Sequence, residues 1–220
     1  MKTTNPAECV ILLHGLARTH RSMNKMAKYL DRKGYIVFNV GYPSTKYPIE
    51  TLAQKTISQA IDNCPSNTKI NFVTHSMGGI LLRQYLQHNT IEKLARIVML
   101  GPPNKGSELV DKFHQFSLFR HINGPAGKQL GTSHSGFIKR LRPIQIDVGI
   151  IAGSRSLNPL LSSLIPEDND GKVSVHSTKL VEMSDHITLP VSHSFMMNNS
   201  IVIEQTLYFL KNGRFYTENE

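Results

Sequence analysis

Short, nearly continuous apolar runs alternate along the chain with longer segments in which apolar residues recur every three or four positions. The first run, ECVILLHG at residues 8–15, is typical of a strand that is buried on both faces of a sheet. Further runs of this kind predict strands at residues 35–43, 69–76, 94–103, 144–154 and 185–191.

The segments between these runs have the spacing of amphipathic helices. In residues 20–34, Met23, Met26 and Leu30 fall on one helical face, and Gly34 is expected to end the helix. The other predicted helices cover residues 49–64, 77–89 and 198–213. This alternation predicts an α/β fold: a roughly six-stranded, mostly parallel sheet with helices on both faces, in a single domain over residues 1–220.

The alternation breaks down between residues 104 and 143. Residues 106–119 have the pattern of one helix, and residues 120–143 are rich in glycine and interrupted. We therefore expect residues 104–143 to form a small insertion that acts as a cap or lid. Residues 157–171 are expected to form a loop.

The composition changes this picture little. Of the 220 residues, 40% are hydrophobic and 19% are charged, as in an ordinary globular domain. No apolar run is long enough to span a membrane, and the first apolar run predicts a core strand rather than a signal peptide. The chain is therefore expected in the cytoplasm, and a secreted mature form stays open.

The formal net charge of +9 permits attraction to anionic partners, but the basic residues are scattered. No aromatic platform or known module for nucleic acid accompanies them, so no nucleic-acid binding is expected. Peripheral contact with a lipid surface stays open, as does the oligomeric state. Cys9 and Cys64 are expected to be buried free thiols, because two cysteines do not make a disulfide framework.

The sequence THSMGG places Ser76 between a predicted strand and a predicted helix. A serine there lies on a tight turn, and the helix N-terminus behind it offers unpaired N–H groups to a developing negative charge. The glycines Gly78 and Gly79 suit such a crowded turn. Thr74 stands where the usual pattern has glycine; we expect slight local strain there, with activity retained.

Several segments in order give the chain its family resemblance. THSMGG resembles the nucleophile elbow of the α/β-hydrolase fold, and LLHGL at residues 12–16 resembles the segment that supplies an oxyanion-hole donor in lipases of this fold. GPPNKGSEL at residues 101–109, NDGKV at 169–173 and PVSHSF at 190–195 are similar to strand-end, aspartate and histidine segments of small bacterial lipases. Together these segments span most of the chain.

The resemblance and the order of the predicted strands assign a Ser-His-Asp arrangement. Ser76 is the expected nucleophile. His193 is the expected base, because it follows the carboxyl end of the last strand, whereas His186 opens that strand. Asp170 is the expected acid and is preferred to Asp168, because it precedes Gly171 in the resembling loop.

The resemblance also implies that the backbone N–H groups of Leu16 and Met77 form the oxyanion hole. We expect the side chain of His14 to be structural, and that of His75 to pack behind the site without acting as the base. There is no H-E-x-x-H motif or Cys/His cluster, so neither a metal nor another cofactor is expected.

The resemblance implies a hydrolase of carboxylic esters, an esterase or small lipase. Phe113, Phe116 and Phe119, with Leu118, are expected either to line an acyl pocket or to form the packed face of one helix. Because a short insertion leaves little room for a lid, short to medium acyl chains are favoured. An acyltransferase, a thioesterase, an amidase and a non-catalytic lipid-binding protein on the same scaffold stay open.

Overall fold

The computed structural model describes residues 7–113, 116–132, 136–165 and 167–217. Six strands form one sheet in which every neighbouring pair is parallel, in the order β2-β1-β3-β4-β5-β6. The strands are β1 (Cys9–Leu13), β2 (Ile36–Val40), β3 (Ile70–His75), β4 (Leu94–Leu100), β5 (Asp147–Gly153) and β6 (Asp185–Leu189). The predicted fold class is confirmed, because the sheet is fully parallel and helices cover both of its faces.

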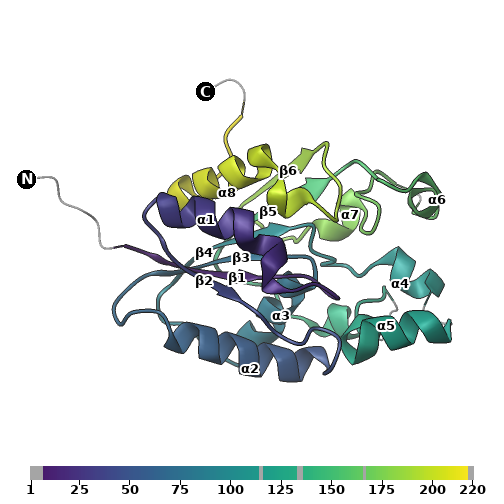
Figure 1. Ribbon diagram of the computed structural model, residues 1–220, viewed down its shortest axis with the longest axis horizontal. Coiled ribbons are helices and arrows are strands. Elements are labelled where there is room, and N and C mark those ends of the chain that lie inside the picture. Colours follow the sequence, from purple (N-terminus) through teal and green to yellow (C-terminus); the bar gives the residue numbers. More distant parts are fainter. Residues whose placement is uncertain (1–6, 114–115, 133–135, 166, 218–220) are drawn as a thin grey trace, which may run out of the picture.

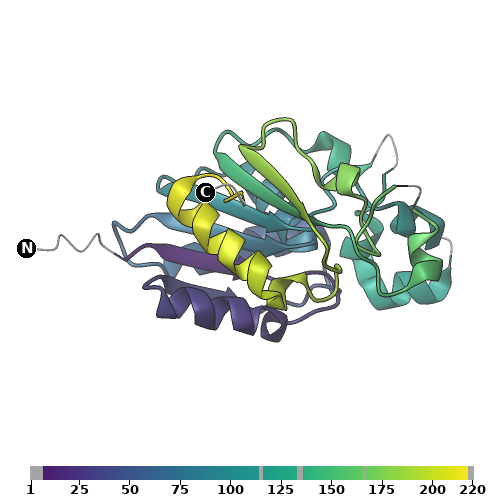
Figure 2. The ribbon, with the colours of Figure 1, turned by 90° about the horizontal axis from the view of Figure 1, so that it is seen from above.

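The helices form two layers (Figures 1 and 2). One face of the sheet carries α1 (Asn24–Arg32) and α8 (Ser200–Asn212), and the other carries α2 (Ile49–Asp62) and α3 (Met77–Leu86). The shorter helices are α4 (Glu108–Phe113), α5 (Ser117–Lys128), α6 (Pro159–Ser162) and α7 (Val175–Thr178), with single turns η1 (His20–Met23), η2 (Phe137–Arg140) and η3 (Met196–Asn198). Of these, α4, α5 and α6 lie together at the right-hand end of the sheet in Figure 1.

Strand β1 shows why the sheet needs two helical layers. Successive side chains of a strand point to opposite faces. Ile11 and Leu13 pack into the core beneath α2 and α3, whereas Val10 and Leu12 pack into the core beneath α1 and α8. All four side chains are fully buried, which explains the continuous apolar run in the sequence.

Two helix ends follow from their sequences. Asn199 caps α8, because its side-chain Oδ1 accepts hydrogen bonds from the N–H groups of Ile201 and Val202. Helix α1 ends at Arg32, and Gly34 follows with a φ of 92°, in the left-handed region that glycine adopts without strain. The prediction that Gly34 ends this helix is confirmed.

Two expectations about local structure are wrong. Residues 106–119 do not form one helix: α4 ends at Phe113 and α5 begins at Ser117. Cys9 and Cys64 are not free thiols but form a disulfide. The sheet brings the start of β1 next to the end of α2, with 6.0 Å between the two Cα atoms, within the usual range for a disulfide. A sequence separation of 55 residues gives no local sign of this contact.

Candidate active site

Three loops at the carboxyl edge of the sheet bring Ser76, Asp170 and His193 together. Ser76 follows β3, Asp170 lies in the loop after β5, and His193 lies in the loop after β6. The Ser76 Oγ hydroxyl donates a hydrogen bond of 3.0 Å to Nε2 of His193. Nδ1 of His193 donates a hydrogen bond of 2.6 Å to Oδ2 of Asp170. Ligands of open parallel sheets bind at this edge.

The backbone at Ser76 is strained in the way a nucleophile elbow requires. Ser76 has φ 53° and ψ −122°, although it is not a glycine, and its side chain is half-buried. Gly78 lets this turn pack against β1, since a Cβ atom there would lie 2.7 Å from the carbonyl oxygen of Leu13. Likewise, a Cβ atom on Gly15 would lie 3.1 Å from Cβ of Ser76. Small residues at these positions are therefore a steric requirement.

Thr74 fits into β3 beside this turn. Its side chain is fully buried, and its hydroxyl has no hydrogen-bond partner among the described residues. Gly79 makes room for it, because a Cβ atom on Gly79 would lie 3.2 Å from the Thr74 Oγ1. The unusual dihedral angles are those of Ser76, whereas Thr74 lies within the regular register of β3 with β1 and β4.

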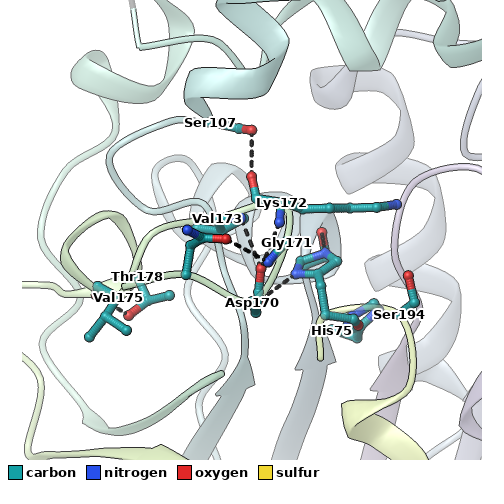
Figure 3. Close-up of polar contacts among 12 residues, drawn as sticks. His75, Ser107, Asp170, Gly171, Lys172, Val173, Val175, Thr178 and Ser194 are labelled. Carbon is teal, nitrogen blue, oxygen red and sulfur yellow. Dashed lines mark hydrogen bonds and ion pairs between the residues drawn. The ribbon is translucent and has the colours of Figure 1, made fainter. Parts of the chain in front are cut away.

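Backbone hydrogen bonds fix the carboxylate of Asp170. Its Oδ1 accepts from the N–H groups of Lys172, at 3.0 Å, and Val173, at 2.9 Å, so that Oδ2 is left for His193 (Figure 3). The backbone N–H of His193 also donates to the carbonyl oxygen of Asp170 at 3.0 Å. Asp170 is only 2% exposed. By contrast, Asp168 is exposed and its side chain has no described contact with His193.

His75 contacts both the backbone and the ring of His193. Nε2 of His75 lies 3.0 Å from the carbonyl oxygen of His193, and the two rings are 4.9 Å apart between centroids. Burial and, next, the nearby His193 hold the pKa of His75 well below its usual value. His75 is therefore neutral and donates its Nε2–H to that carbonyl oxygen. As expected, the base within hydrogen-bonding distance of Ser76 is His193, not His75.

The two predicted oxyanion donors lie near Ser76 in different ways: Leu16 lines the cavity beside Ser76, and Met77 directly follows Ser76 in the chain. The N–H groups of Leu16 and Met77 do not donate to any described residue, and Met77 is the first residue of α3, where an N–H has no acceptor within the helix. The side chain of His14 is structural, as expected. It stacks on Tyr42 with 4.0 Å between the ring centroids, accepts the Tyr42 N–H at Nε2 and bonds the Gly15 carbonyl oxygen through Nδ1.

A cavity of about 340 Å³ opens beside Ser76. Its walls are mainly apolar and include Leu109, Val110 and Phe113 from the α4 region. Phe116 contacts Phe113, with 6.0 Å between ring centroids, but it is 53% exposed and is not among the described residues that line the cavity. The side chains of Phe119 and Leu118 lie outside the described part of the structure. Of the predicted pocket residues, Phe113 is thus the one placed at the cavity.

The cavity also contains residues that the sequence analysis did not select. Arg18 and Lys172 line it, each two positions beyond a selected residue, Leu16 and Asp170 respectively. Ser107 joins the cavity wall to the Asp170 loop, because its hydroxyl donates to the carbonyl oxygen of Lys172 at 3.0 Å (Figure 3). Their closeness to the motif residues is the sequence signal that could have identified Arg18 and Lys172.

Among the described residues, no group of three or more His, Cys, Asp or Glu side chains is placed to hold a metal ion. None of the helices in that part of the chain has the length and apolar character needed to cross a membrane.

Comparison with known proteins decides the family. A family model described as the alpha/beta hydrolase fold matches residues 8–137, more than half of the chain. The chain belongs to the alpha/beta-hydrolase fold family. A comparison with curated protein sequences finds no match.

Solved structures of this alpha/beta-hydrolase fold resemble the chain at low sequence identity. The mature form of the Bacillus licheniformis lipase BlEst2 has a TM-score of 0.75 and 20% identity, with 96% of this chain and 95% of that chain covered. The propeptide form of that lipase is covered over 52% of its length. A metagenomic carboxyl esterase has a TM-score of 0.65 and 20% identity, with 87% and 68% covered. Phospholipase PlaB from Legionella pneumophila has a TM-score of 0.64 and 18% identity, with 79% and 46% covered. At these identities the likeness concerns the fold.

Proposed function

We propose that the protein is a serine hydrolase that cleaves carboxylic esters through an acyl-enzyme. The observation that carries this proposal is the continuous chain of hydrogen bonds from Ser76 through His193 to Asp170, beside a mainly apolar cavity. Membership of the alpha/beta-hydrolase fold family supports a hydrolase in general, and the lipase and esterase names among the structural neighbours are consistent with an ester substrate.

The geometry suggests how the residues would act. Oγ of Ser76 attacks the ester carbonyl carbon while its proton passes to Nε2 of His193. Asp170 holds the His193 ring in place and stabilises the imidazolium that forms. The oxyanion accepts hydrogen bonds from the backbone N–H groups of Leu16 and Met77. Donors of this kind typically contribute about 2.7–4 kcal/mol each to stabilisation of the transition state.

The tetrahedral intermediate then breaks down. The bond to the alcohol oxygen breaks, and His193 gives its proton to the departing alcohol. A water molecule attacks the acyl-enzyme in the same way, with His193 as base, and releases the carboxylic acid and free Ser76. No other co-reactant is needed.

The cavity supports a substrate of modest size. Its volume of about 340 Å³ is near the lower end of the roughly 300–1,000 Å³ typical of ligand pockets. Leu109, Val110 and Phe113 offer an apolar surface to an acyl chain. We therefore propose short to medium acyl chains. Acyl transfer, thioester and amide cleavage use the same arrangement and are alternatives.

The disulfide bears on the compartment. Such bonds persist mainly in oxidising environments. Of the two locations that the sequence leaves open, the Cys9–Cys64 bond therefore favours the exported form over the predicted cytoplasmic one. Contact with a lipid surface stays a prediction.

The proposed function is tested with p-nitrophenyl esters from acetate to palmitate on the wild type and Ser76→Ala. We expect turnover by the wild type, best with short to medium chains, and a loss to background in the variant. Labelling of the wild type, but not of Ser76→Ala, by a fluorophosphonate probe would support a nucleophilic serine. No turnover and no labelling of the wild type would contradict the proposal and favour a non-catalytic lipid-binding protein.

A further inference from the structure

The charged side chains around the cavity are all of one sign. Among the described residues that line it, Arg18 and Lys172 carry charges and no carboxylate does. The nearest carboxylate, Asp170, is buried, and its two oxygens are occupied by His193 and by the N–H groups of Lys172 and Val173. Within the part of the chain that is described, neither Arg18 nor Lys172 forms an ion pair with a carboxylate.

Each cation is fixed to a loop of the site. The Arg18 guanidinium donates through Nη2 to the carbonyl oxygen of Ser194, the residue after His193, at 3.3 Å. Lys172 is held through its backbone. Its N–H donates a hydrogen bond to Oδ1 of Asp170, and its carbonyl oxygen accepts one from the hydroxyl of Ser107. In Figure 3 the Lys172 side chain extends from the Asp170 loop toward the side on which Ser194 lies.

The two cations lie close enough to interact. Both side chains line the same cavity. Although Lys172 is exposed overall, desolvation and, next, the positive charge of Arg18 lower the pKa of its ammonium, and the negative charge of Asp170 offsets only part of this lowering. Two like charges without a bound anion repel each other, and an anionic ligand between them would relieve this repulsion. Arg and Lys together suit a carboxylate or a phosphate, which accept several charged hydrogen bonds.

The position of the pair indicates which half of an ester carries the anion. His193 protonates the departing alcohol in the proposed mechanism, so the alcohol half leaves on the side of His193. Arg18 is bonded to the residue next to His193, whereas the apolar walls come from Leu109, Val110 and Phe113.

We propose that Arg18 and Lys172 form an anion subsite that selects esters whose alcohol portion carries a carboxylate or a phosphate. This inference rests on the proposed function and assigns its substrate class: an apolar acyl group joined to an anionic alcohol. Both cations act as specificity-determining residues and hold the anionic group beside the leaving oxygen.

The test compares matched substrates that differ only in charge. The first pair is 4-nitrophenyl butyrate and 5-butyryloxy-2-nitrobenzoic acid, whose leaving group carries a carboxylate. The second pair is 1-monobutyrin and 1-butyrylglycerol 3-phosphate, followed by titration of the released acid. We expect kcat/KM to be at least tenfold higher for the anionic member of at least one pair, and the pair that responds identifies carboxylate or phosphate.

The variants connect this preference to the two residues. In Lys172→Gln and Arg18→Gln, the ratio of kcat/KM for the anionic ester to that for its neutral partner should fall at least fivefold, and it should fall further in the double variant. Lys172→Arg should keep the preference, because it keeps the charge. Lys28→Gln is the matched control. Lys28 is exposed on α1 and is not among the described residues that line the cavity, so kcat/KM should stay the same for both the anionic and the neutral ester.

Two outcomes would overturn the inference in distinguishable ways. If the wild type hydrolyses the neutral esters without any preference for the anionic ones, or if the variants lower both rates equally, the anion subsite is wrong and the proposed hydrolase stands. If the wild type hydrolyses none of the four esters and Ser76 is not labelled by a fluorophosphonate, the proposed function is wrong and the subsite falls with it.

Discussion

The loops that carry Ser76, Asp170 and His193 differ from the apolar cavity wall in what positions the side chains that face the cavity. The three side chains are joined by hydrogen bonds, and the Asp170 loop is fixed by backbone contacts to His193 and to itself. The apolar wall comes from the short helix α4, which packs against α5, and α5 is interrupted at Gly124, where φ is 63° and ψ is −164°. Hydrogen bonds attach α4 to neighbouring segments, such as those that Ser174 and Ser177 donate to Glu108. The side chains of Leu109, Val110 and Phe113 that line the cavity, however, are apolar.

This difference separates chemistry from selectivity. The sheet positions the reacting groups, since all of them follow the carboxyl ends of its strands. The wall shapes the space beside them without contributing to the chain of hydrogen bonds. Changes in Ser76, Asp170 or His193 should therefore alter the rate for every ester, and changes in the apolar wall should alter which acyl chain is preferred.

The largest expected effect comes from Asp170→Asn. The amide carries no charge, and its NH2 group can donate to Nδ1 of His193. The ring then loses its charge partner and can carry its proton on Nε2, where it cannot accept the proton of Ser76. Loss of this function in a serine triad lowers kcat by roughly 10⁴-fold, and we expect a loss of about 10³–10⁴-fold for all chain lengths. The measurement is kcat with p-nitrophenyl butyrate and octanoate.

Asp168→Asn is the matched control. Asp168 lies two positions away and is exposed, so its replacement should leave kcat within about twofold of the wild type. Comparable losses in both variants would show that the loop as a whole, and not the Asp170 carboxylate, matters. The distinction between loops and wall would then be weakened.

A smaller effect is expected from Phe113→Ala in the wall. Removing the ring enlarges the cavity that Phe113 lines, so the optimum should shift toward longer acyl chains. The ratio of kcat/KM for octanoate to that for butyrate should rise by about fivefold, which is less than the roughly 10–200-fold that one methylene contributes in a tight pocket. Phe116→Ala should leave the ratio unchanged, because Phe116 is largely exposed. A uniform loss of rate in Phe113→Ala would contradict the proposed division.

The sequence predicts the loops much better than the wall, for a physical reason. Ser76 and His193 each follow a strand that is recognisable from its apolar run, and a parallel sheet brings all such positions to one edge. Gly78 also follows from the sheet topology, since a Cβ atom added there would lie 2.7 Å from the carbonyl oxygen of Leu13 in β1, the strand that pairs with β3. These features depend on short-range patterns and on the rules of sheet topology.

The features that the sequence did not predict depend on contacts between distant segments. The Cys9–Cys64 bond forms because β1 and α2 meet in space. Arg18 becomes part of the cavity because it reaches Ser194, which is 176 residues away. The break between α4 and α5 has no comparable signal, because residues 106–119 keep a helix-like pattern throughout.

A further prediction concerns the support behind the loops. Because the pKa of His75 is held well below about 6.5, its value in the unfolded chain, the unfolded state takes up a proton below about pH 6.5 that the folded state does not. His75 therefore lowers the free energy of unfolding as the pH falls below that value, by at most about 1.4 kcal/mol per pH unit.

His75→Gln tests this sign. Glutamine can still donate to the His193 carbonyl oxygen but cannot be protonated, so the dependence of Tm on pH between 7 and 5 should be shallower than in the wild type. His14, whose pKa is also lowered chiefly by burial, should account for part of the dependence that is left. Parallel curves for the two proteins would mean that His75 does not contribute.

The smallest effect is expected at Thr74, which lies in β3 two residues before Ser76 and takes no part in the hydrogen bonds of the site. Its hydroxyl is buried and has no partner among the described residues, so Thr74→Val removes an unsatisfied polar group and keeps the shape of the side chain. The free energy of unfolding should rise by up to about 1 kcal/mol, with kcat within about twofold of the wild type. Urea unfolding measures the first quantity and ester hydrolysis the second.

Thr206→Val in α8 is the matched control, because the Thr206 hydroxyl is equally buried but donates to the Val202 carbonyl oxygen at 2.7 Å. Its replacement should lower the free energy of unfolding by about 1 kcal/mol. If the free energy of unfolding rises in Thr74→Val and falls in Thr206→Val, the fold does not need the Thr74 hydroxyl. The space left by Gly79 is then enough to explain why threonine is tolerated in place of the usual glycine. A large loss of activity in Thr74→Val alone would instead make that hydroxyl part of the elbow.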